Sequence, residues 1–174
     1  MFGTSYERKD IKSWNSIRDW AIEKGLSKID ASKLNFKLWT DPQSMEKALP
    51  MPGSLEVYRD LVNQINEVPI ITVRGCNLRD VTVGWFNKHL PEVPESWINM
   101  RASNEIKDND FKIQQLIDKT INWHFDDSFT IVLMAIKNTN TNLFYISSEI
   151  TPEYINKNSR VTVIPNFEWS PELY

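Results

Sequence analysis

Between Pro52 and Ser147 the sequence alternates between helical spacing of apolar residues and short apolar runs of strand length, and this alternation constrains the fold most. Strand–helix alternation with short connections implies right-handed crossovers and a mostly parallel sheet. Helices then cover both faces of that sheet. We therefore expect a three-layer, Rossmann-like α/β domain that binds its ligands beyond the carboxyl ends of the strands.

The first apolar run, VPIITV, is continuous, and such a run is typical of a strand that is buried on both faces. Apolar residues at helical spacing precede and follow it. A last apolar run, RVTVIP, lies near the end of the sequence. The expected strands are 68–73, 97–100, 121–125, 142–147 and 160–165. The expected helices of this region are 52–65, 78–90, 108–119 and 128–138.

Residues 1–50 lie outside this alternation. Asp10 is a suitable cap for a helix that ends at Gly25, and residues 26–50 read as irregular. We expect residues 1–50 to form a small helical cap or lid segment over the strand ends, and residues 51–174 to form the α/β core.

Composition limits the cellular compartment and the kinds of binding site that are expected for this chain. The 174 residues have a net charge of -3, which disfavours a broad basic surface. The single cysteine, Cys76, allows no internal disulfide and favours a reducing, cytoplasmic setting. No apolar run approaches the roughly 20 residues of a membrane span, so no membrane partner is expected. His89 and His124 show no zinc-ligand spacing with Cys76, and both are expected to be structural.

Polar side chains follow three of the expected strands. If these strands are parallel, their ends meet at one edge of the sheet, and the polar residues converge there. The two arginines are candidates to bind a substrate phosphate, with surface ion pairs as the alternative. The five residues are Thr72, Arg74, Arg101, Asp126 and Asp127.

The adjacent pair Asp126–Asp127 ends an apolar strand in the segment INWHFDDS. Two neighbouring carboxylates repel each other and are costly to desolvate unless a cation offsets their charge. Mg²⁺ is bound by one or two carboxylates together with waters and phosphate oxygens. The alternative is a strand end followed by a helix N-cap, with Asp127 or Ser128 opening the next helix.

Three segments, in this order, resemble the haloacid dehalogenase superfamily of phosphatases. They are PGSLEVYRDL with VPIITVRGCNLRDVTVGWFNKHL, then NDFKIQQLID, then INWHFDDS. The likeness covers roughly residues 50–147 and is greatest for nucleotidase-like and polynucleotide-phosphatase-like members. The resemblance implies a Rossmann-like fold and an activity on phosphate monoesters.

The resemblance also implies roles for single residues. Thr72 would hydrogen-bond a phosphate oxygen of the substrate, and Lys112 would neutralise the phosphoryl group and the attacking carboxylate. Asp126, with Asp127, would hold Mg²⁺, either directly or through water. An ordinary strand threonine and a solvated helix lysine are the alternatives for Thr72 and Lys112.

The family's first motif, Asp-x-Asp-x-Thr, supplies the nucleophile and the general acid–base, and this sequence has no such motif. One trace of it is Phe2–Thr4. Another is Asn166 and Glu168, if strand 160–165 occupied the central place of the sheet instead of an edge. A third expectation is that a partner chain or a second copy completes the sheet.

Three functions follow from these patterns. The first is a Mg²⁺-dependent phosphohydrolase that acts on a nucleotide or a nucleic-acid end phosphate. The second is a catalytically inactive domain that binds a phosphorylated ligand or a protein partner, and the missing motif favours it. The third is an interaction module that shares only its architecture with the family. The interaction module is disfavoured because the sequence retains residues at the family's site positions, namely Thr72, Lys112 and Asp126–Asp127.

Overall fold

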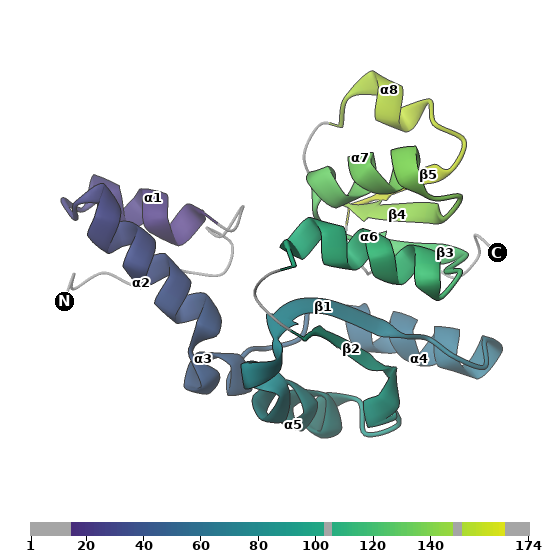
Figure 1. The fold of residues 1–174 in the computed structure, drawn as a ribbon, viewed down its shortest axis with the longest axis horizontal. Helices are drawn as coiled ribbons and strands as arrows, with labels where there is room; N and C mark the ends of the chain where they lie inside the picture. The colour runs from purple at the N-terminus through teal and green to yellow at the C-terminus, as the bar shows by residue number, and fades with distance from the viewer. Residues whose placement is uncertain (1–14, 103–105, 148–150, 166–174) are drawn as a thin grey trace. The chain divides into compact units, whose positions relative to one another are not determined.

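The computed structural model describes residues 15–102, 106–147 and 151–165 (Figure 1). The chain divides into two compact units, residues 1–48 and 49–174. The described part of the first unit is helical, and the second unit contains helices and parallel strands. The mixed α/β class predicted from the sequence is thus confirmed. In the described part of the chain, every helix is too short or too polar to cross a bilayer.

The first unit contains the helices α1 (Ser16–Glu23), α2 (Lys28–Thr40) and α3 (Pro42–Glu46). Gly25, at a φ of 93°, ends α1 as predicted. The prediction that residues 26–50 are irregular is wrong. The side chain of Ser27 caps α2 by accepting a hydrogen bond from the Asp30 backbone N–H at 3.1 Å. The buried residues of α2 are Ala31 and Asn35, so a small and a polar residue conceal the helical pattern.

The second unit begins with a parallel pair of strands, β1 (Ile70–Gly75) and β2 (Ile98–Arg101). The helices α4 (Ser54–Gln64) and α5 (Arg79–His89) supply apolar side chains that pack with these strands. Two short 3-10 turns, Cys76–Leu78 and Glu95–Trp97, lie in the connections. The buried centre of this cluster is Leu90, Val93 and Ile98, and its partly buried members include Leu55, Tyr58, Ile70, Val83, Phe86 and Met100.

The rest of the second unit is built on a parallel sheet in the order β3-β4-β5. The strands are β3 (Trp123–Asp126), β4 (Asn142–Ile146) and β5 (Val161–Ile164), and the helices are α6 (Asp108–Asp118), α7 (Phe129–Asn138) and α8 (Glu153–Asn156). A second apolar core joins these elements, and its buried members are Ile113, Leu116, Val132, Ala135, Leu143, Tyr145, Ile155 and Val161.

The described strands thus form two separate parallel sheets, where the sequence predicts one. Helix α6 lies against β1, and Ile71 of β1 packs on the core of the three-stranded sheet (Figure 1). Every residue of β1 is only partly buried, so the prediction of a strand buried on both faces is wrong. The physical reason is that β1 pairs with β2 along one edge and with no other described strand.

Among the strands that the structure describes, β5 lies at an edge of its sheet, beside β4. The alternative that places residues 160–165 centrally is therefore wrong, and the expected edge position is confirmed. The two traces of a first motif, at Phe2–Thr4 and at Asn166 with Glu168, lie outside the described residues.

Candidate functional site

The candidate site is built where α6 meets the end of β3. In a strand, alternate side chains point to the same face, so His124 and Asp126 of β3 lie on one face. Lys112 is in the second turn of α6, whose buried residues Ile113 and Leu116 anchor the helix in the apolar core. The helix thereby holds Lys112 beside the carboxyl end of β3.

Three side chains form a polar cluster there, which we call the Asp126 cluster: the buried Asp126 and the partly buried Lys112 and His124. Lys112 Nζ lies 2.7 Å from Asp126 Oδ2, and His124 Nε2 lies 3.0 Å from the same oxygen. The Asp126 side chain is 2% exposed, against 18% for Lys112 and 11% for His124. A buried carboxylate requires such partners, because an unpaired charge away from water is costly.

The other carboxylate oxygen of Asp126 stabilises the turn into α7. The backbone N–H of Ser128 donates a hydrogen bond to Asp126 Oδ1 at 2.9 Å. Ser128 is the N-cap of α7, and its hydroxyl oxygen accepts from the Ile131 N–H at 3.5 Å. The predicted capping role therefore belongs to Ser128, and the adjacent Asp126 supports the same turn.

Burial alone would raise the pKa of Asp126. The hydrogen bond from His124 and the positive charge of Lys112 outweigh burial, and together they hold the pKa of Asp126 below its ordinary value of 3.8. At neutral pH Asp126 is therefore a carboxylate, and the cluster contains a fixed ion pair between Lys112 and Asp126.

The donors around Asp126 do not fit a magnesium ion bound directly to this carboxylate. A carboxylate has about four acceptor positions on its two oxygens. Three donors already occupy Asp126, and one of them is the charged Lys112 ammonium. Asp127, the second predicted ligand, is exposed. Among the residues that the structure describes, no three His, Cys, Asp or Glu side chains are grouped as metal ligands.

Thr72 and Arg74 lie where the pairing of β1 with β2 becomes irregular. Thr72 is opposite Met100, and the next paired residues are Gly75 and Arg101, so Val73 and Arg74 are extra residues in β1. The Thr72 hydroxyl oxygen accepts a hydrogen bond from the Arg74 N–H at 3.4 Å, which leaves its own proton to donate.

The guanidinium of Arg74 is directed toward α5, where Nη1 lies 3.4 Å from Thr82 Oγ1. Thr82 is fully buried, and burial lowers the pKa of Arg74. This contact orients Arg74 within the β1–β2 part of the unit. Its predicted contact with a substrate phosphate stays a prediction.

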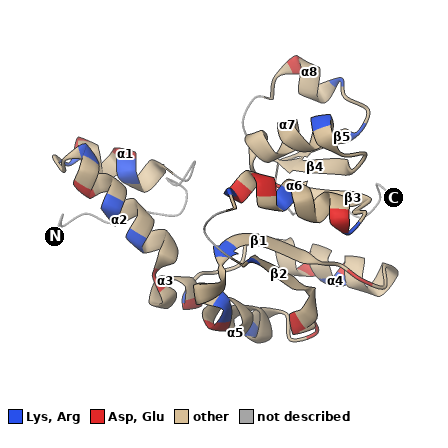
Figure 2. Ribbon diagram, viewed as in Figure 1, with Lys and Arg blue, Asp and Glu red and all other residues tan. Residues whose placement is uncertain are grey.

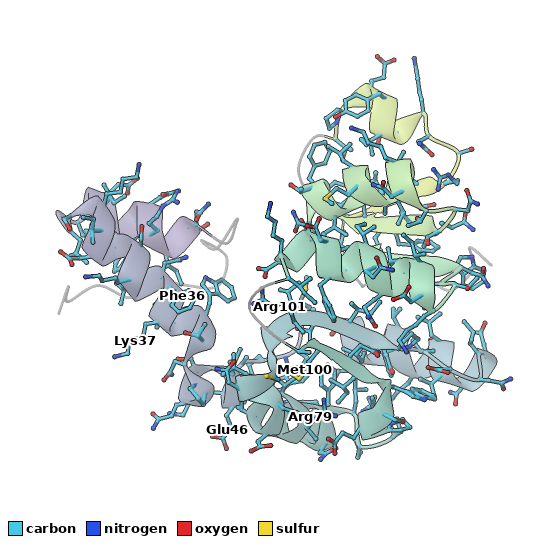
Figure 3. All side chains as sticks on the ribbon, in the orientation of Figure 1. Phe36, Lys37, Glu46, Arg79, Met100 and Arg101 are labelled. Carbon is cyan, nitrogen blue, oxygen red and sulfur yellow. The ribbon has the colours of Figure 1, made fainter. Side chains whose placement is uncertain are left out.

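The guanidinium of Arg101 binds the beginning of α6. Arg101 Nη1 donates to the backbone oxygen of Ile106 at 2.9 Å and forms an ion pair with Asp108 at 2.5 Å. Figure 3 shows the side chain of Arg101 next to the start of this helix, and Figure 2 shows the acidic first turn of α6 in red. Arg101 thus holds the start of the helix that positions Lys112, through its hydrogen bond to Ile106 and its ion pair with Asp108.

His124 is expected from the sequence to be structural, and in the structure its ring contacts Asp126 at 3.0 Å. The sequence did contain a signal, because His124 and Asp126 are two residues apart in a predicted strand and so share a face. This spacing does not show that Lys112 of α6 lies beside the same face. Sequence spacing gives no direct measure of how near α6 lies to β3.

Comparison with the models of known protein families gives no match to this sequence, and comparison with curated proteins gives none either.

Proposed function

We propose that this chain is a haloacid-dehalogenase-like, Rossmann-type domain that binds a phosphate monoester without cleaving it. The proposed ligand is a nucleotide or a nucleic-acid end phosphate. Lys112 and the hydroxyl of Thr72 would contact the phosphate at the carboxyl ends of the strands. The observation that supports this proposal is the ion pair of Lys112 with Asp126, which fixes an ammonium group at that edge.

The geometry supports binding for three reasons. Asp126 accepts one N–H of Lys112, and an ammonium group has three, so two remain for phosphate oxygens. The Lys112 side chain retains 18% of its exposure, which gives a ligand access to it. Helix α6 also lies against β1, the strand that contains Thr72. A charge held in place by its neighbours costs less ordering when an anion binds.

A second candidate is the predicted phosphohydrolase. Phosphoryl transfer depends on positioning and charge neutralisation, and a preorganised lysine beside a buried carboxylate is suited to both. We rank it second because the sequence has no Asp-x-Asp-x-Thr motif to supply a nucleophile. The expectations that residues 1–50 act as a lid and that another chain completes the sheet stay predictions under either candidate.

Calorimetric titration of the full chain with AMP, with adenosine and with a 5′-phosphorylated oligonucleotide tests the first candidate. We expect the phosphorylated ligands to bind and adenosine not to bind. Lys112→Gln should weaken phosphate binding about tenfold to a hundredfold, because a hydrogen bond to a charged group contributes about 1.5–3 kcal/mol. Lys119→Gln, at an exposed lysine just after the same helix, is the matched control and should bind as the wild type does.

Turnover of para-nitrophenyl phosphate and a nucleotide panel, with and without Mg²⁺, separates the two candidates. The binding function predicts no turnover above that of Asp126→Ala. Mg²⁺-dependent turnover that disappears in Asp126→Ala would establish the phosphohydrolase instead. Failure of both AMP and the oligonucleotide to bind the folded wild-type chain would contradict the binding function.

A further inference from the structure

Asp126 already accepts from three donors within the chain, and one of them is a charged ammonium. Lys112 Nζ and His124 Nε2 share Oδ2, at 2.7 Å and 3.0 Å, and the Ser128 N–H takes Oδ1 at 2.9 Å. The Lys112 ammonium compensates the charge of Asp126 and would repel a metal ion that approached the same oxygen. The arrangement therefore neutralises Asp126 without any ion from solution.

We propose that Lys112 is the built-in cation of this site and that it excludes divalent metal ions from Asp126. The metal predicted for Asp126 and Asp127 would have to displace the Lys112 ammonium or bind close beside it, and there the ammonium would repel it at short range. Because the carboxylate is 2% exposed, solvent screens this repulsion weakly.

The position of Asp127 supports the same conclusion. Mg²⁺ demands near-octahedral oxygen ligands and binds through one or two carboxylates. Asp126 is the buried member of the pair and Asp127 is exposed. Strand β3 ends at Asp126, and the Ser128 N–H and the start of α7 follow directly. The backbone at this point therefore already forms the turn between β3 and α7.

The proposal predicts that removal of Lys112 creates a metal site. Without its ammonium, Asp126 becomes a buried carboxylate with incomplete compensation, and such a carboxylate attracts a cation. Lys112→Gln removes the charge and keeps most of the side-chain volume. We expect it to bind Mn²⁺ at least about tenfold more tightly than the wild type, a change of about 1.4 kcal/mol.

The experiment is a titration of the full chain with Mn²⁺, followed by the electron paramagnetic resonance signal of the free ion. Wild type and Lys119→Gln should show no manganese binding that Asp126→Asn abolishes. Lys112→Gln should gain one site, and the double variant Lys112→Gln with Asp126→Asn should lose it. Circular dichroism of each variant checks that it is folded.

Two results would overturn the proposal. The first is a wild-type manganese site that disappears in Asp126→Asn, and this arm needs no substitution at Lys112. The second is a folded Lys112→Gln chain that binds manganese no better than the wild type. Both readouts concern metal binding alone, so a failure to bind AMP would contradict the proposed function and leave this inference standing.

Discussion

At the scale of single residues, Asp126 has its charge compensated by Lys112 and its geometry fixed by His124 and the Ser128 N–H. Asp126→Asn removes the charge and leaves the Lys112 ammonium largely buried. We expect this change to lower the free energy of unfolding by about 2–4 kcal/mol at neutral pH. Urea denaturation measures the loss.

Asp127→Asn is the matched control, because Asp127 is adjacent and exposed. It should change stability by no more than about 0.5 kcal/mol. Equal effects of the two substitutions would show that the Asp126 cluster contributes little to stability.

The same carboxylate predicts how stability depends on pH. The folded pKa of Asp126 lies below its ordinary value of 3.8, so its contribution is complete above that value. The contribution disappears as the pH falls through the lower, folded pKa. The stability gap between wild type and Asp126→Asn should therefore be constant near neutrality and narrow below pH 3.8. A gap that already closes on the neutral side would contradict the lowered pKa.

Sequence reasoning predicted Lys112 and Asp126 as site residues, and the structure brings them together at 2.7 Å. It did not predict that they would pair with each other. The Asp pair suggested a cation from solution, whereas the nearest cation belongs to a helix that precedes the strand. The distance between Lys112 and Asp126 depends on how α6 packs against the core, and no local sequence pattern predicts it.

At the scale of elements, Tyr58 connects α4 to the segment that leads into β1. Its hydroxyl donates to the backbone oxygen of Val68 at 2.6 Å. Burial, followed by the negative charge of Glu92, raises the pKa of Tyr58 well above its ordinary range, so the hydroxyl stays protonated and can donate. Tyr58→Phe should cost about 1 kcal/mol in unfolding free energy.

Tyr154→Phe serves as the control for this measurement, because Tyr154 is 61% exposed on α8. Thermal or urea unfolding of both variants gives the comparison. If Tyr58→Phe unfolds at the same point as Tyr154→Phe, the hydrogen bond to Val68 does not hold α4 in place.

The helices and strands that sequence reasoning identified best are those with a regular apolar pattern, such as α7 and β4. Helix α2 was missed because its buried positions are Ala31 and Asn35, while Ile29 and Phe36 are exposed. An apolar pattern measures hydrophobicity, and in α2 the packed face is not the most hydrophobic one. Its N-cap, Ser27 with Asp30, was the signal that could have revealed it.

At the scale of the whole molecule, parallel strands were predicted and are present, but their division into two sheets was not predicted. The alternation of elements determines that strands run parallel, since each connection crosses over. It does not determine which strands are neighbours. The run VPIITV reads as central because it is apolar throughout, yet β1 is partly buried and pairs with one described strand.

The two separate sheets have a consequence for how the folded chain opens locally. Strand β4 lies between β3 and β5 and contributes Leu143 and Tyr145 to the larger core, so its amides open only when that core is disrupted. The ladder of β1 and β2 is a separate hydrogen-bonded unit. Native-state hydrogen exchange should therefore show slower exchange in β4 than in β1, with two opening free energies. Identical values in the two strands would mean that both ladders belong to one cooperative unit.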